Sequence, residues 1–316
     1  MHRKSARHRN GGMSRMTAAI RIGVSGWRYP PWRSAFYPKG LQQRRELEFA
    51  SRVFPSIELN GSFYSLQRPE NYATWYRETP ARFVFSVKAP RFITHIKRLR
   101  DIDAPLANFF ASGVANLGEK LGPILWQLPP TMRYDAALLE RFLASLPQDT
   151  GAASKLARRH DARVTGRARI AFGPVRRLRH ALEVRHDSFI DPGLIEQLRR
   201  HDVALVIADT AGKWPQVGDL TADFVYIRLH GDEELYRSAY IEPVLTLWAE
   251  RIRAWADSGE PRGIKRISHE PAPAGGRREV FCYFDNTDKV EAPANARRLM
   301  EKLKVEWSAP DRPAAP

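Results

Sequence analysis

Eight short apolar runs, each ending in a polar residue, are the feature that most constrains the fold of this chain. Most of them are separated by stretches in which apolar residues recur with helical spacing, so predicted strands and helices alternate. Repeated strand and helix units bury a parallel sheet, and eight of them close it into a TIM-type (β/α)8 barrel of the α/β class. The predicted strands cover residues 20–25, 56–60, 83–88, 124–127, 181–185, 204–209, 224–230 and 280–286.

The length of the chain is consistent with a single domain that carries appendages. It has 316 residues, of which 43% are hydrophobic, and a barrel of this type needs about 250 residues. We therefore expect one barrel domain over residues 20–304. Three appendages are predicted around it: a disordered basic tail at 1–19, a basic surface insertion at 148–179 with one short helix near 154–159, and a disordered tail at 305–316.

The sequence carries no sign of export or of membrane insertion. It has no uncharged apolar run of about 18 residues, and residues 1–15 lack the apolar segment of a signal peptide. We therefore expect a cytoplasmic protein that does not bind a membrane. The single cysteine, Cys282, falls inside the last predicted strand, where a buried structural thiol is expected rather than a nucleophile.

The net charge of +16 is concentrated in two segments. Residues 1–19 carry five Arg or Lys and no acid (+5), and residues 150–180 carry nine against Asp161 (+8), so together they hold +13. Such segments are typical of a solvated surface, and they also suit phosphate contacts with RNA or DNA. Base stacking there is not indicated, because only Phe172 interrupts them as an aromatic residue.

The polar residues at the strand ends are the predicted site. Because side chains alternate across a strand, residues two apart share a face, and the active sites of such barrels lie at the carboxyl ends of the strands. We therefore expect five polar pairs to face the barrel axis near this mouth. They are Glu58 with Asn60, Ser86 with Lys88, Glu183 with Arg185, Arg228 with His230, and Tyr283 with Asp285.

Burying an unpaired charge costs several kcal/mol of folding free energy, so the charges at the mouth must pair with one another or be exposed to water. One interpretation is a buried ion network that closes the barrel. The other, which we favour, is a catalytic site in which cations hold an anionic ligand and carboxylates act as acid or base. The predicted catalytic residues are Glu58, Glu183, Asp285 and His230. The predicted ligand-binding residues are Trp27, Asn60, Tyr64, Lys88, Gln127, Arg185, Asp209, Arg228 and Asn286.

Other chemistries find less support in the sequence. Carboxylates at several strand ends could take magnesium or manganese, but no paired-histidine motif is present, so we assign no metal ligand. No glycine-rich phosphate loop occurs, and Ser25 has no histidine partner that the spacing would indicate. The aromatic residues after the first two strands, among them Trp27 and Tyr64, could stack on a base or sugar, or simply pack the rim.

Seven stretches at the strand ends together resemble the YecE-like family, domain of unknown function 72. They read GVSGW at 23–27, ELNGSFY at 58–64, FSVK at 85–88, WQLPP at 126–130, LEVRH at 182–186, YIRLHG at 226–231 and YFDN at 283–286. The resemblance covers roughly residues 20–304 and implies a barrel of alternating strands and helices. It implies no catalytic role, because the family has no established reaction. Asp285 stands where the family often has an asparagine.

The sequence thus favours an enzyme, a hydrolase or lyase acting on a small anionic ligand such as a phosphate-bearing compound, at the mouth of the barrel. The alternative from another class is a nucleic-acid-binding protein that uses the basic tail and insertion. A third interpretation is a non-catalytic scaffold protein in which a buried ion network closes the mouth of the barrel. The sequence identifies neither a cofactor nor an oligomeric state.

Overall fold

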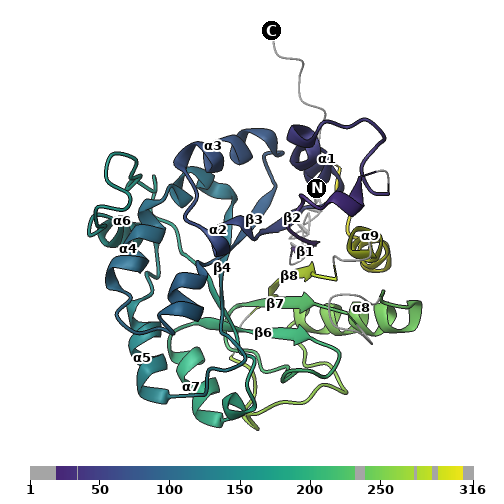
Figure 1. Ribbon diagram of the computed structural model, residues 1–316. Helices are drawn as coiled ribbons and strands as arrows, with labels where there is room; N and C mark the ends of the chain where they lie inside the picture. Colours follow the sequence, from purple (N-terminus) through teal and green to yellow (C-terminus); the bar gives the residue numbers. More distant parts are fainter. Residues whose placement is uncertain (1–18, 34, 232–238, 274–275, 287–290, 309–316) are drawn as a thin grey trace, which may run out of the picture.

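Eight parallel strands close into one barrel in the order β1 to β8 (Figure 1). The structure is a computed structural model that describes residues 19–33, 35–231, 239–273, 276–286 and 291–308. The prediction of a (β/α)8 barrel is confirmed. The strands are β1 (Ile20–Ser25), β2 (Ser56–Leu59), β3 (Val84–Lys88), β4 (Leu121–Gln127), β5 (His180–Glu183), β6 (Val203–Asp209), β7 (Phe224–Leu229) and β8 (Glu279–Phe284).

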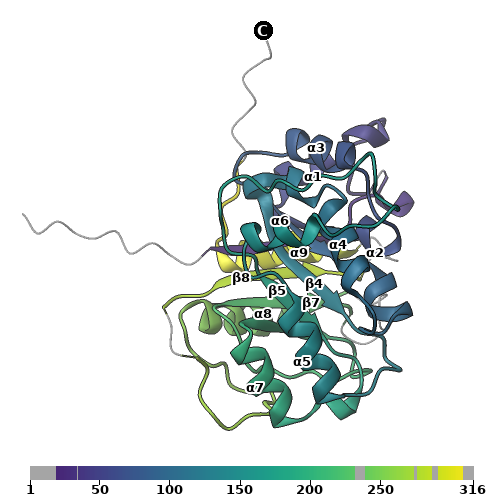
Figure 2. The ribbon, with the colours of Figure 1, turned by 90° about the vertical axis from the view of Figure 1, so that its left-hand side faces the viewer.

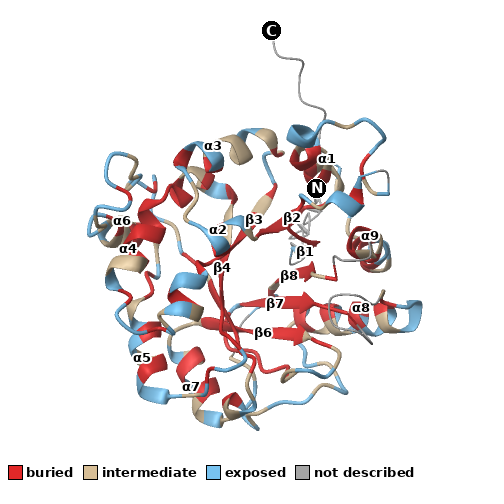
Figure 3. Cartoon of the chain, viewed as in Figure 1, coloured by how far each residue is buried: buried red, intermediate tan, exposed pale blue. Residues whose placement is uncertain are grey.

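Helices cover the outside of the barrel and expose only their outward faces (Figure 3). Figure 2 shows α5 and α7 side by side outside the sheet. Both begin at an aspartate that caps the helix, since Asp135 accepts from the backbone N–H of Leu138 and Asp191 from that of Gly193. The helices are α1 (Glu46–Val53), α2 (Gly61–Tyr64), α3 (Pro69–Glu78), α4 (Asp103–Ala111), α5 (Ala136–Ser145), α6 (Thr150–Ala157), α7 (Pro192–Arg200), α8 (Glu242–Ala256) and α9 (Glu291–Leu303).

Alternation along the strands separates two sets of buried side chains. The outward residues join the helices in one large core, while the inward residues fill the barrel as a smaller cluster that includes Leu125, Tyr226 and Tyr283. Space inside the barrel is tight where β1 meets β2, because a Cβ atom on Gly23 would lie 1.9 Å from the carbonyl oxygen of Ser56. Only glycine fits there.

The strand predicted at 124–127 begins earlier than expected, at Leu121. Residues Gly122 and Pro123 belong to β4, although neither residue type is usual inside a strand. A Cβ atom on Gly122 would lie 2.5 Å from a methyl carbon of Val84 on β3. The glycine is therefore needed for close packing inside the barrel, and sequence propensity alone hides this part of the strand.

The insertion at 148–179 is packed against the barrel wall and is not a loose surface excursion. Its helix α6 covers Thr150–Ala157 rather than 154–159, because Asp149 caps it by accepting from the N–H of Ala152. α6 packs on α4, and Ala153, Ala157 and Phe172 are buried. Small alanine side chains let the two helices approach closely, which weak apolar periodicity does not reveal.

The described residues reach further toward the carboxyl end than the boundary predicted at 305. Val305 and Trp307 pack against the core, and the indole N–H of Trp307 donates to the carbonyl of Ser51 at 3.0 Å. Residues 1–18 and 309–316 lie outside the described residues, so the predicted basic tail stays a prediction. Across the part of the chain that is described, no helix is both long enough and apolar enough to span a lipid bilayer.

Candidate functional site

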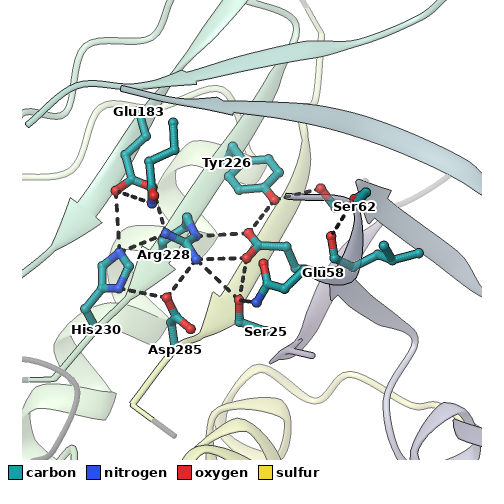
Figure 4. A network of polar contacts seen from close by, with 12 residues as sticks. Ser25, Glu58, Ser62, Glu183, Tyr226, Arg228, His230 and Asp285 are labelled. Atoms are coloured by element: carbon teal, nitrogen blue, oxygen red, sulfur yellow. Dashed lines mark hydrogen bonds and ion pairs between the residues drawn. The ribbon is translucent and has the colours of Figure 1, made fainter. Parts of the chain in front are cut away.

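Four side chains gather around Arg228 at the carboxyl ends of the strands (Figure 4). The Nε and Nη2 atoms of Arg228 donate to the two carboxylate oxygens of Glu58, at 2.9 and 2.8 Å. Nη1 donates to Glu183 at 2.7 Å, and Nη2 also donates to Asp285 at 2.7 Å. With His230, these residues form what we call the Arg228 cluster.

Arg228 itself does not face a ligand. Its side chain is completely buried, and its remaining Nη1 proton points to Nε2 of His230 at 3.2 Å, so all five N–H groups are used inside the protein. In this arrangement Arg228 offers no N–H group to a ligand anion, and its predicted ligand-binding role stays a prediction. The carboxylates around Arg228 are strong hydrogen-bond acceptors, and the sequence alone could not show that they bind it.

The cluster keeps Glu183 and Asp285 ionised. Burial alone would raise the pKa of Glu183, but the guanidinium groups of Arg185 and Arg228 hold it well below the ordinary value of 4.5. The pKa of Asp285 is likewise lowered, because Arg228 and His230 outweigh the effect of its burial. Neither group is poised to carry a proton at neutral pH while the cluster is intact.

His230 is buried and neutral within the cluster. Burial first and Arg228 second lower the pKa of its imidazole. Since Arg228 donates to Nε2, the ring proton lies on Nδ1, which is 3.1 Å from Oδ2 of Asp285. Nε2 thus accepts from Arg228 while Nδ1 lies beside Asp285, so both ring nitrogens contact members of the cluster.

Several other residues support the cluster from the barrel interior. The amide of Gln127 donates to both carboxylate oxygens of Glu183, at 3.1 and 3.0 Å, as its predicted inward position implies. Ser25 donates to Glu58 and accepts from Asn60, and the hydroxyl of Tyr226 donates to Glu58 at 2.7 Å. Glu58 therefore accepts hydrogen bonds at both oxygens and is completely buried.

Two cations at the same mouth are less fully engaged. Arg185, which is 9% exposed, donates from Nε to Glu183 and stacks 4.0 Å from the ring of Trp214. Its Nη2 atom is buried and has no hydrogen-bond partner among the described residues. Lys88 is 8% exposed, and its ammonium lies 4.2 Å from the ring of Phe63.

Two predicted ligand-binding residues face the helices and not the mouth. Asp209 follows Leu205 and Ile207 on the outer face of β6, and its carboxylate accepts from the indole N–H of Trp248 in α8 at 3.3 Å. Asn286 is completely buried and donates to Asn295 in α9 at 3.1 Å. Asp209 lies on the outward side of β6, and Asn286, two residues beyond β8, contacts α9, so neither faces the barrel axis, and their predicted ligand binding stays a prediction.

Aromatic residues form the rim beside β1 and β2. Trp27 is buried and packs edge-on against Trp75, with ring centroids 5.5 Å apart. Tyr64 is 71% exposed. Both line a cavity of about 260 Å³ together with Tyr29, Asn60 and other residues, and Tyr64 also lines a second cavity of about 250 Å³ that contains Phe92 and Arg163. Trp27 thus packs the rim and still borders open space.

Three residues near the cluster were not among the predicted site residues. Tyr226 shares the face of Arg228, so alternation alone could have indicated it. His95 lies in a π-helical turn after β3, where burial, Lys88 and Arg185 lower the pKa of its imidazole to about 4. Trp214 lies in the segment after β6. No spacing rule places these two loop residues at the mouth.

The described residues contain no group of three or more His, Cys, Asp or Glu side chains that could hold a metal ion. At the mouth, the three carboxylates that could have formed such a group all bind the guanidinium of Arg228. The position between them is filled by a cation that the protein itself supplies.

The fold and the cluster define a (β/α)8 barrel protein with a buried charge network beneath its mouth. Residues 21–316 match the model of the family described as "Protein of unknown function DUF72". The chain belongs to the DUF72 family. The resemblance seen in the sequence motifs is thereby confirmed.

Relatives and solved structures agree with this assignment. The chain is 26% identical to the UPF0759 protein YecE of Escherichia coli K12 over 310 residues, which cover 90% of this chain and 93% of that protein. The UPF0759 protein YunF of Bacillus subtilis is 34% identical over 116 residues, covering 35% of this chain and 40% of YunF. A DUF72 family protein of Thermotoga maritima has the same fold, with a TM-score of 0.66 and 23% identity, over 90% of this chain and 99% of that one.

Proposed function

We propose that the barrel mouth is the active site of an enzyme, a hydrolase or lyase, that acts on a small anionic ligand such as a phosphate-bearing compound. The observation that carries the proposal is the buried guanidinium of Arg185, whose Nη2 nitrogen has no hydrogen-bond partner among the described residues. Leaving a buried charged donor unsatisfied is costly, so such a group indicates a missing acceptor.

Arg185 is held in the geometry that anion recognition requires. Glu183 fixes its Nε at 2.6 Å and Trp214 supports its flat face, so the guanidinium is oriented before a ligand arrives. A pre-oriented planar guanidinium matches carboxylate and phosphate oxygens well. Arg185 therefore holds the anion, and Lys88 approaches the same ligand with its amine.

Asp285 is the carboxylate of the cluster best placed for acid or base chemistry. It is 15% exposed at its side chain, whereas Glu58 and Glu183 are completely buried. Arg228 and His230 hold Oδ2, so Oδ1 is the oxygen that can meet a ligand proton. Ligand binding that excludes water would raise the low pKa of this group toward the range useful for proton transfer.

Replacing Arg185 with glutamine is expected to weaken the binding of inorganic phosphate by about 10- to 100-fold, because a hydrogen bond to a charged group contributes about 1.5–3 kcal/mol. Isothermal titration calorimetry measures this affinity directly. Arg200→Gln is the matched control, since Arg200 lies on α7 and pairs with Glu140 far from the mouth. Equal phosphate affinity in wild type and Arg185→Gln would contradict the proposal.

A second candidate function is the binding of single-stranded nucleic acid at the rim. Arg163 of the basic insertion lies 5.3 Å from the ring of Phe92 and lines the same cavity as Tyr64. Exposed aromatic rings beside arginines are typical of surfaces that stack bases and neutralise phosphates. The contact of Arg163 with Phe92 brings one charge of the insertion to the rim, which supports this candidate.

Replacing Tyr64 with alanine is then expected to weaken the binding of a labelled oligothymidylate by about 1–3 kcal/mol, the contribution of one stacked base. Fluorescence anisotropy at several salt concentrations gives the slope of the logarithm of the binding constant against the logarithm of the salt concentration. This slope should be about 0.7 smaller in magnitude for Arg163→Gln, as expected for one lost phosphate contact. Arg253→Gln on α8 serves as the control. Absence of binding by wild type at low salt would eliminate this candidate.

A further inference from the structure

We propose that Lys88 is a nucleophile that forms an imine with an anionic carbonyl compound, such as a 2-oxo acid or a phosphorylated aldehyde. This inference rests on the proposed function and names its substrate class. Four observations on described residues carry it: the position of Lys88, the contacts of its amine, the groups around it, and the nearby Arg185.

Lys88 is the last residue of β3 and shares the inward face of Ser86. It is one of two buried lysines among the described residues, and the other, Lys120, provides a contrast. The ammonium of Lys120 donates to the carbonyls of Tyr76 and Thr79, at 2.6 and 2.8 Å, as a structural buried lysine should. The amine of Lys88 has no hydrogen bond or ion pair with any described residue and contacts the ring of Phe63 instead.

The surroundings of Lys88 favour the neutral amine. Burial is the main cause that lowers its pKa from 10.5 to about 8, and Arg228 lowers it further, against the opposing effect of Glu58, Asp285 and Glu183. At pH 7 this pKa gives roughly 300-fold more free amine than a lysine with a pKa of 10.5 has. A neutral amine is the form that attacks carbonyl carbon.

Arg185 can hold the anionic end of a ligand whose carbonyl group meets Lys88. Lys88 ends β3 and Arg185 follows β5 by two residues, on either side of β4, and both lie close enough to His95 to lower the pKa of its imidazole. A compound with a carboxylate or phosphate a few bonds from its carbonyl group spans such a pair. A neutral carbonyl compound would lose the contact with Arg185.

The chemistry balances without an added oxidant or reductant. The amine nitrogen of Lys88 attacks the carbonyl carbon, both amine protons leave with the carbonyl oxygen as water, and a carbon–nitrogen double bond forms. Protonated, this bond accepts the electron pair of a neighbouring C–C or C–H bond as that bond breaks. We assign the exchange of the proton at the neighbouring carbon to Asp285, and water then hydrolyses the imine and restores the amine.

Reductive trapping tests the inference. The full-length protein is incubated at pH 7 with sodium cyanoborohydride and either pyruvate or glycolaldehyde phosphate, and peptide mass spectrometry locates the reduced adduct. We expect modification of Lys88 at least about tenfold faster than that of Lys155, an exposed lysine on α6. Lys155→Arg should leave trapping unchanged, Lys88→Arg should abolish it, and Arg185→Gln should slow trapping of the charged probes but not of neutral glycolaldehyde.

Modification of Lys88 no faster than that of Lys155 by both probes would overturn the inference, as would an unchanged yield of adduct in Lys88→Arg. Circular dichroism and the thermal midpoint show whether Lys88→Arg folds, and Lys88→Met provides a second variant if it does not. Phosphate binding is measured in parallel. If the wild-type protein binds phosphate but is not trapped at Lys88, only the imine inference is overturned. If it neither binds phosphate nor is trapped, the proposed function is overturned as well.

Discussion

Replacing Arg228 with methionine is expected to lower the free energy of unfolding by about 3–5 kcal/mol, the usual cost of removing one partner from a buried ion pair. The substitution leaves the carboxylates of Glu58, Glu183 and Asp285 close together without their shared cation. Methionine fills most of the space of the aliphatic stem, so the loss reports on charge rather than on a cavity. Urea unfolding followed by far-UV circular dichroism measures the change.

The control for this prediction removes the charges together. In a variant that combines Arg228→Met with Glu58→Gln, Glu183→Gln and Asp285→Asn, the three carboxylates lose their charge together with Arg228. Among the described residues, Arg185 is then the one cation that loses an ion-pair partner, Glu183, so part of the lost stability should return. Arg200→Met on α7 should cost less than about 1 kcal/mol, because its pair with Glu140 is exposed. A stable Arg228→Met variant would mean that the cluster is wet and that Arg228 faces a ligand after all.

Most of the fold could be predicted from the sequence because its strands are buried on both faces and read as apolar runs. The start of β4 could not, because Gly122 fits the narrow space beside Val84 and Pro123 follows it, and neither residue type has strand propensity. The packing of the insertion escaped prediction for a similar reason. Alanine at 153 and 157 is informative only once α4 is known to lie against it.

The candidate site could be predicted as a region but not as a set of contacts. Alternation correctly placed Glu58, Glu183 and Arg228 on the barrel axis, and the same rule, applied to Leu205 and Ile207, would have excluded Asp209. Which cation pairs with which carboxylate depends on distances across the barrel. Sequence spacing within one strand carries no information on those distances, so the saturation of Arg228 and the unpartnered donor of Arg185 became visible only in three dimensions.

The roles of the two arginines show how one barrel mouth can serve both stability and binding. Arg228 pairs with three carboxylates below the mouth, and one of these, Glu183, in turn fixes the Nε of Arg185 above it. In the function that we propose, the ion network and the ligand site, which the sequence presents as alternatives, are two layers of one arrangement. A rigid lower layer supports the orientation of the upper one.

Acidification from pH 7 to pH 4 is expected to lower the free energy of unfolding by about 3 kcal/mol through His180 alone. Its Nε2 donates to the carbonyl of Pro147 at 2.8 Å, and its Nδ1 accepts from the indole N–H of Trp126 at 3.1 Å. Burial lowers the pKa of this imidazole from 6.5 to about 4. Below pH 6.5 the unfolded chain therefore binds a proton at His180, whereas the folded protein binds it only near pH 4. The free energy of unfolding falls as the pH is lowered through this window, and it stops falling below pH 4.

His180→Gln isolates this contribution, because glutamine can keep one donor toward Pro147 and one acceptor toward Trp126 but does not titrate. His95 and His230 also have lowered pKa values and act in the same direction, so the wild type should lose more than the share of His180. The difference in the free energy of unfolding between wild type and His180→Gln, measured by urea unfolding at half-unit steps of pH, should shrink by about 3 kcal/mol between pH 7 and pH 4. Parallel pH profiles would show that His180 is protonated in the folded state, with its bond to Trp126 already broken.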